Sequence, residues 1–308
     1  MRALIIGLGL AGVAAALHAQ KGGVKKEPPP VDTVHLRFAW PVGLNAAVTG
    51  QRFKARLQEG KADTTNVRLS YQMSVEPHAK GRVVRFHHFA VPGVPEVEEL
   101  EERISALMPS LIVDTTGEFV GIVDVDAMRR ELDAVLGPAS KHPLVERFRS
   151  TEVLTALAAN EWNALVGTWI GGDLELGETY FAEFELPFPL YPGVTLPVVQ
   201  EFTALDRVPC IAGETERRCI ELESTVYPDE EAFAALIARM MGEVVPDSID
   251  VSMNDWALET TIHLIAEPGT LVPYLLEVSK RVSMKMQGSS GRQEEIKTTR
   301  FEYPARRP

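Results

Sequence analysis

The sequence predicts an α+β fold in which a predominantly antiparallel sheet has helices packed on one face. Residues 67–75 (VRLSYQMSV) alternate in polarity, and residues 82–91 (RVVRFHHFAV) follow after a turn-rich linker, as in an antiparallel hairpin. Residues 95–108 then place apolar side chains every three or four positions, which is the spacing of an amphipathic helix. A similar succession of strand and helix patterns later in the chain indicates two related halves.

The elements that follow in the first half are a strand pair and two helices. Residues 110–125 are two apolar strands around a turn that contains Gly117. Asp126 can cap the N-terminus of a helix that extends through Leu136, and Gly137 is a typical stop signal. Residues 151–166 predict a second helix.

The second half begins with a proline-rich segment and ends with a hairpin. Prolines exclude a central helix there and favour extended edge strands or a wrapping segment. These prolines are Pro187, Pro189, Pro192 and Pro197. At the other end, the turn residues 288–291 (GSSG) separate two strand-like runs and predict a last hairpin.

The two halves align without gaps over two short stretches. Residues 82–92 lie over 218–228, and residues 111–120 lie over 263–272. In each half an amphipathic helix follows the first stretch, the later one capped by Asp229. An internal duplication explains this match, and so does chance similarity between two strand–helix–strand units.

The N-terminus contains Gly7-Leu8-Gly9-Leu10-Ala11-Gly12, which fits the G-x-G-x-x-G turn of dinucleotide-binding folds. Such a fold needs a second parallel strand, but three prolines stand where it would be, at residues 28–30. A secretory signal agrees better, because one basic residue precedes an apolar run at 3–17. We expect cleavage between Ala19 and Gln20.

The predicted organisation follows from these segments. It comprises a signal peptide (1–19), a flexible Pro/Gly-rich tether (20–34), a first β-rich half (35–170) and a second β-rich half (171–308). The short apolar run and its cleavage signal predict a chain with no transmembrane segment after cleavage. The formal net charge of −12 makes nucleic acid an unfavourable partner, because phosphate binding needs a basic surface.

The two cysteines, Cys210 and Cys219, flank a polar turn between β-branched and apolar residues. A hairpin would place their sulfurs opposite each other, and an exported protein favours pairing of such cysteines. We therefore expect a structural disulfide. Two unrelated free thiols are the alternative.

No motif in the sequence fixes a catalytic, cofactor or metal site. The DTTG turn at Asp114 lacks the second aspartate that aspartic-protease chemistry needs. His87 and His88 are neighbours in a predicted strand, so they should point to opposite faces, with His88 partly buried. Trp162 and Trp169 share a helical face, which favours core packing over a ligand pocket.

The middle of the chain resembles an uncharacterised family of bacterial exported proteins, periplasmic or lipid-anchored. The resemblance covers residues 110–187 and includes the turn at Asp114, the helix that holds Trp162, and the segment LELGETY at 174–180. It implies export and a β-rich fold, and it supplies no catalytic residues. This sequence departs from the family in lacking the lipid-anchor cysteine.

These observations favour an exported, non-catalytic binding module of the bacterial envelope that holds an apolar ligand or client, in the periplasm or outside the cell. Its partner would be an apolar small molecule or an envelope protein. The alternatives are a hydrolase with an unrecognised active site and a structural envelope protein that contacts partners. A deep apolar cleft would favour the first function, and converging His, Asp or Ser side chains would favour the hydrolase.

Overall fold

The structure is a computed structural model that describes nine ranges of the chain. They are residues 32–58, 61–93, 108–137, 146–147, 149–187, 194–214, 218–236, 254–286 and 289–304. Four predicted features lie outside them: the signal peptide, its cleavage point at Ala19 and Gln20, most of the tether, and all but the last residue of the expected helix at 95–108.

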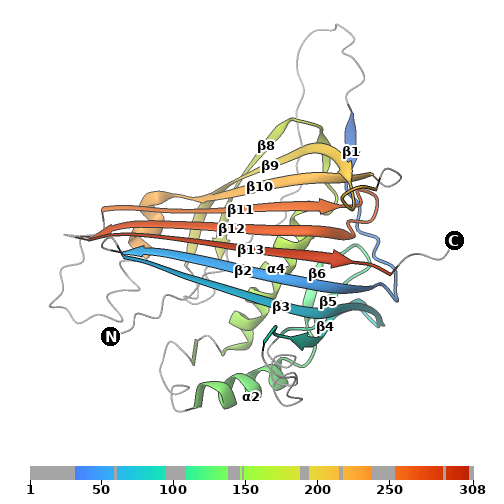
Figure 1. Cartoon of the computed structure of the whole chain (residues 1–308), viewed down its shortest axis with the longest axis horizontal. Coiled ribbons are helices and arrows are strands. Elements are labelled where there is room, and N and C mark those ends of the chain that lie inside the picture. The colour runs from blue at the N-terminus through green and yellow to red at the C-terminus, as the bar shows by residue number, and fades with distance from the viewer. Residues whose placement is uncertain are drawn as a thin grey trace, which may run out of the picture.

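Strands dominate the described residues, and most belong to one antiparallel sheet (Figure 1). Its order is β6-β5-β4-β3-β2-β13-β12-β11-β10-β9-β8, so β6 and β8 are its two edges. The strands are β2 (Asn45–Gln58), β3 (Lys61–His78), β4 (Gly81–Ala90), β5 (Leu111–Val113), β6 (Phe119–Ile122), β8 (Thr179–Pro187), β9 (Thr195–Pro209), β10 (Arg218–Pro228), β11 (Asn254–Ala266), β12 (Pro273–Met286) and β13 (Ser289–Glu302).

Few helices accompany this sheet. Within the described ranges they are α2 (Val125–Leu136), α4 (Thr151–Leu165), the 3₁₀ turn η2 (Gly167–Trp169) and helical residues at 146–147 and 230–236. In Figure 1, α4 crosses the strands behind the sheet. A separate two-stranded sheet pairs β1 (Thr33–His35) with β7 (Asp173–Glu175), so the last residues assigned to the tether belong to a strand.

The predicted α+β class is therefore wrong, and the fold is mainly β. The sequence pattern underestimated the strands: β3 continues through Lys61–Arg68, where every side chain is exposed. Such a stretch has no apolar alternation, but hydrogen bonds to the neighbouring strand hold it extended. The two halves also do not form two helix-on-sheet units, because the pairing of β13 with β2 joins them in one sheet.

Most local predictions are confirmed. The expected hairpins form as β3–β4, β5–β6 and β12–β13. The turn of the last hairpin is predicted at residues 288–291, but residues 289–291 belong to β13 and pair with β12. Helix α2 ends at Gly137 as expected, but its N-cap is Asp124, whose side chain accepts a hydrogen bond from the Ala127 amide at 2.9 Å. Asp126 lies within the first turn of the helix, so the predicted cap is wrong by two residues.

The proline-rich segment is extended where it is described. Strand β8 is an edge strand that ends at Pro187, and Pro197 lies in β9. The segment that contains Pro189 and Pro192 lies outside the described residues. The predicted cap at Asp229 is also present, because its side chain accepts from the Ala232 amide at 2.8 Å.

The sheet curves around residues 36–41, and the contacts of this short segment demonstrate it. Phe38 packs on Gly117, in the turn between β5 and β6, while the Ala39 amide donates to Thr270 in the turn between β11 and β12. Strands β5 and β12 are five positions apart, about 24 Å in a flat sheet. Two adjacent residues contact both turns only if the sheet curls. We call the face turned toward this segment and α4 the inner face.

Aromatic side chains fill one end of the inner face. We call Phe38, Trp40, Trp162 and Trp169 the aromatic plug. The Trp162 indole stacks edge-on against Phe38 at 5.6 Å and Trp40 at 5.3 Å, and Trp169 contacts Phe202 at 6.0 Å. All three tryptophans are buried. Because buried indole N–H groups need acceptors, Trp162 donates to the Gly117 carbonyl and Trp40 to the Leu271 carbonyl, each at 2.8 Å.

Gly117 is required at its position by both its backbone and its surroundings. Its φ of 95° lies in the left-handed region, and a Cβ there would collide with the Phe38 ring. The turn is fixed further by Asp114, whose carboxylate accepts from the Thr116 amide at 2.8 Å and the Glu118 amide at 2.9 Å. Partial burial raises the pKa of Asp114, but these hydrogen bonds, together with one from the Thr116 hydroxyl, outweigh it and lower the pKa. This carboxylate therefore organises a turn.

Candidate ligand-binding site

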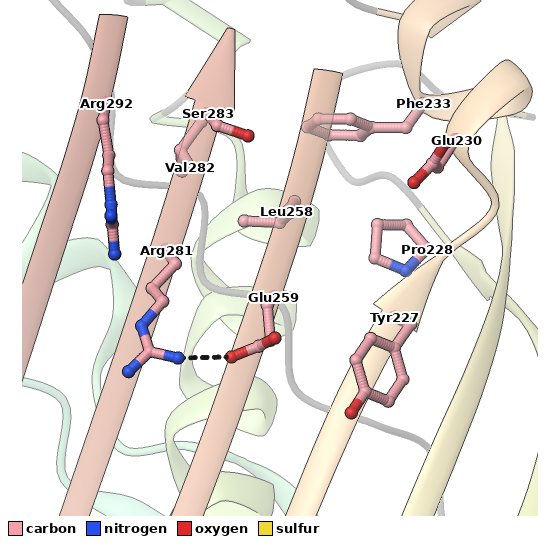
Figure 2. Close-up of a pocket in the computed structure, with 10 residues that line it drawn as sticks. All are labelled: Tyr227, Pro228, Glu230, Phe233, Leu258, Glu259, Arg281, Val282, Ser283 and Arg292. Atoms are coloured by element: carbon pink, nitrogen blue, oxygen red, sulfur yellow. Dashed lines mark hydrogen bonds and ion pairs between the residues drawn. The ribbon is translucent and has the colours of Figure 1, made fainter. Parts of the chain in front are cut away.

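A pocket of about 440 Å³ lies at the end of the sheet away from the aromatic plug (Figure 2). Its apolar lining comes from Phe233 of the helical residues 230–236, Leu258 of β11 and Val282 of β12. We call it the end pocket. Its volume is in the range of small-molecule sites.

The apolar side chains of the end pocket belong to a second core cluster, separate from the plug. Strand residues Leu186, Leu196, Val198, Val226 and Leu258 form this cluster with Phe233. The helical turn is tied to the sheet because the Asp229 amide donates to the Pro197 carbonyl at 2.8 Å. The pocket is thus built on rigid elements.

Polar side chains form the rim of the end pocket. Tyr227, Glu259 and Arg281 alternate with the apolar lining along β10, β11 and β12, so these polar lining residues belong to the outer face of the strands. Arg281 donates to Glu259 at 3.1 Å, the contact dashed in Figure 2, and to Glu294 at 3.3 Å. Partial burial, with the carboxylates of Glu201 and Glu259, raises the pKa of Tyr227, so this phenol stays neutral.

Charged side chains occupy the inner face between the end pocket and the plug. We call them the charged belt: Arg52, Lys54, Lys280, Glu295 and Lys297 from the sheet, and Glu161 from α4. Register places Lys280, Glu295 and Lys54 in one row across β12, β13 and β2, and Lys297 and Arg52 in the adjacent row. These positions continue the alternation of buried Val48 and Leu276, so they face inward.

Water reaches the charged belt although α4 lies across it. Glu161 accepts from Lys297 at 3.3 Å, so this helix residue points toward the inner face of the sheet. The two side chains are nevertheless 64% and 45% exposed. A helix in close contact with a sheet buries the residues that face it. The Glu161–Lys297 pair between α4 and strand β13 is therefore open to water.

Charged side chains of the belt shift the pKa values of Glu161 and Lys280. The positive charge of Lys297 lowers the pKa of the Glu161 carboxyl, although desolvation by the surrounding protein opposes this shift. Partial burial lowers the pKa of Lys280, while the carboxylates of Glu161 and Glu295 oppose that change. Arg52 donates to Glu295 at 2.8 Å.

The structure confirms the disulfide and the core role of the tryptophans. Cys210 and Cys219 are bonded, with Cα atoms 4.9 Å apart, at the end of the β9–β10 hairpin. This hairpin lies at the plug end, where both cysteines belong to the main core cluster. The disulfide therefore lies in the core at the plug end and is remote from the end pocket.

The histidine pair departs from the prediction. His88 has a φ of 56° at an irregularity in the β3–β4 register, which breaks strand alternation. The His87 and His88 rings therefore lie 4.6 Å apart instead of on opposite faces, and His88 is exposed instead of partly buried. Within the described ranges, no group of three or more His, Cys, Asp or Glu side chains could hold a metal ion.

One histidine–carboxylate pair lies on the outer face of the sheet. His263 of β11 and Glu221 of β10 are 2.7 Å apart and half-buried. In the part of the chain that the structure describes, His263 has no hydrogen bond to a hydroxyl or thiol nucleophile. The pair thus links two strands and lacks the geometry of a catalytic triad.

Sequence reasoning did not identify the end pocket or the charged belt. The inward lysines and arginines stand in ordinary strand patterns such as RFKAR at 52–56. Alternation indicates that Arg52 and Lys54 share a face, but it does not indicate which face is the inner one. The resemblance to exported bacterial proteins gave no site residues that could be compared.

Comparison with known proteins assigns no family. No family model matches the chain, and no curated protein matches it. A solved structure described as lipid-protein interactions in lipovitellin is similar at a TM-score of 0.40 and 8% identity, over 88% of this chain. The chain spans about a quarter of the length of that protein, since the match covers 26% of it.

None of the described helices is long and apolar enough to cross a membrane. The resemblance to an exported bacterial family stays a prediction.

Proposed function

We propose that this protein is an exported, non-catalytic binding protein of the bacterial envelope that holds an apolar or partly apolar small molecule at the end pocket. The observation that carries the proposal is the pocket itself, with Phe233, Leu258 and Val282 as its apolar lining. Apolar surface that remains open in a folded protein gains free energy when an apolar ligand covers it.

The disulfide and the predicted signal peptide support export. Disulfides persist in oxidising compartments, and Cys210–Cys219 is of the structural kind. The proposal includes cleavage between Ala19 and Gln20. Mass spectrometry of the protein recovered from its exporting host tests this point, and a mature chain that begins before Gln20 contradicts it.

Two experiments test ligand binding directly. Native mass spectrometry should show an adduct that is lost on denaturation. In a fluorescence titration, the methyl ester of a polyene fatty acid should bind saturably. Val282→Trp, which fills the pocket, should weaken ester binding at least about tenfold, a loss of about 1.4 kcal/mol.

The matched control is Val135→Trp, because Val135 is 51% exposed on α2. It should leave ester binding unchanged, and circular dichroism should show that both variants are folded. Absence of both the adduct and saturable ester binding overturns the proposal. Equal binding by the two variants also overturns the assignment to the end pocket.

A further inference from the structure

The charged belt has a net charge opposite to that of the protein. Four basic and two acidic side chains compose it, while the chain as a whole carries −12. The four cations repel one another, and the carboxylates of Glu161 and Glu295 offset this repulsion only in part, since two acidic groups face four basic ones. Such an arrangement is suited to the binding of an anion.

The belt adjoins the apolar lining of the end pocket. Lys280 is two residues from Val282 on β12, and Thr260 is two residues from Leu258 on β11, each pair on the same face. Two residues along a strand span about 7 Å. One elongated molecule can therefore contact the apolar lining and the belt together.

Buried polar atoms without partners provide a second, independent observation. The Thr260 hydroxyl and the side-chain amide oxygen of Gln200 have no hydrogen-bond partner within the described part of the chain. Both residues are at least 99% buried. Register places them in the same row as Lys280, across Val226. Buried polar atoms are nearly always hydrogen-bonded, so this row contains unsatisfied polar atoms next to the charged belt.

We infer that the ligand is an amphiphile with an anionic head group, whose head lies over the charged belt while its apolar part lies in the end pocket. Lys280 and Lys297 bind the carboxylate or phosphate of the head. The inference rests on the proposed function, which requires only the apolar part.

A pair of probes that differ only in head charge separates the two proposals. Wild-type protein is titrated, near neutral pH and at low salt, with a polyene fatty acid and with its methyl ester. The acid should bind about tenfold more tightly than the ester, and added salt should reduce this preference. Lys280→Met and Lys297→Met should each reduce the preference to about threefold or less, with ester affinity unchanged.

Arg300→Met is the matched control, because Arg300 lies on β13 three residues from Lys297, on the outer face. It should keep the full preference for the acid. Equal affinity of wild-type protein for acid and ester overturns the inference and leaves the proposed function standing, whereas failure to bind either probe removes both. Displacement of the acid by inorganic phosphate at comparable concentration also overturns it, because the belt would then take free anions without a tail.

Discussion

The plug end and the pocket end of the inner face use the same strands but differ in what covers them. Strand β12 carries Tyr274 and Leu276 at the plug end, followed by Lys280 and Val282 toward the pocket. Tyr274 and Leu276 belong to the same buried core cluster as Trp40 and Trp162, whereas water reaches the charged belt at Lys297 and Glu161. Alternation along a strand determines which side chains share a face. Whether that face becomes a core or a site depends on the segment that covers it.

The largest expected effect is at the plug. Trp162→Ala removes a buried side chain and leaves the Gly117 carbonyl without its donor, so the free energy of unfolding should fall by about 3–5 kcal/mol. Urea denaturation measures this change. Phe181→Ala is the control, since Phe181 is 60% exposed, and it should change stability by less than about 0.5 kcal/mol. Similar losses in both variants would contradict the assignment of Trp162 to the core.

The next largest effect on stability is expected for the disulfide at the end of the β9–β10 hairpin. Replacement of Cys210 and Cys219 by serine should lower the free energy of unfolding by about 2–3 kcal/mol, because the denatured chain regains the entropy of an open loop. Ester binding at the remote end pocket should persist in the folded variant. Loss of binding without loss of stability would show that the two ends are coupled.

A smaller effect on stability, with a larger one on binding, is expected in the end pocket. Leu258→Ala should cost about 2 kcal/mol, the lower end for such changes, because this side chain already borders open space. Ester binding should weaken several-fold at the same time. Leu57→Ala, at a position 48% exposed on β2, should change neither quantity. Retained ester affinity in Leu258→Ala would place the ligand elsewhere.

The smallest effect is expected in the charged belt. The pKa of Glu161 lies below its ordinary value of 4.5, so the Glu161–Lys297 pair stabilises the fold above that pH. This contribution is lost as pH falls through the lowered pKa. Glu161→Gln should cost less than about 1 kcal/mol near neutral pH, because water reaches both side chains.

The pH dependence provides the internal control for this pair. Denaturation of the wild-type protein and Glu161→Gln should show a difference in the free energy of unfolding near pH 7 that shrinks as the pH falls below 4.5. A difference that stays constant across this range would mean that the Glu161 carboxylate contributes through packing rather than through its charge.

Local structure in this protein could be predicted because short-range patterns determine it. The hairpin of β3 and β4, the helix α4 and the bonded pair Cys210–Cys219 all follow from spacing within a few residues. The sequence does not distinguish Asp124 from Asp126 as the cap of α2, since both suit the start of the helix. The histidine pair was misjudged because a local bulge changes which way His88 points.

The sequence by itself determined the antiparallel hairpins, the disulfide and the absence of a recognisable catalytic motif. Only the tertiary structure decided the curvature of the sheet, the joining of β13 to β2, and the inward direction of Lys280 and Lys297. The physical reason is range: turns and helices depend on neighbours along the chain, whereas curvature depends on contacts such as Phe38 on Gly117, which lie far apart in sequence. The end pocket and the charged belt are products of that curvature, so no local pattern could reveal them.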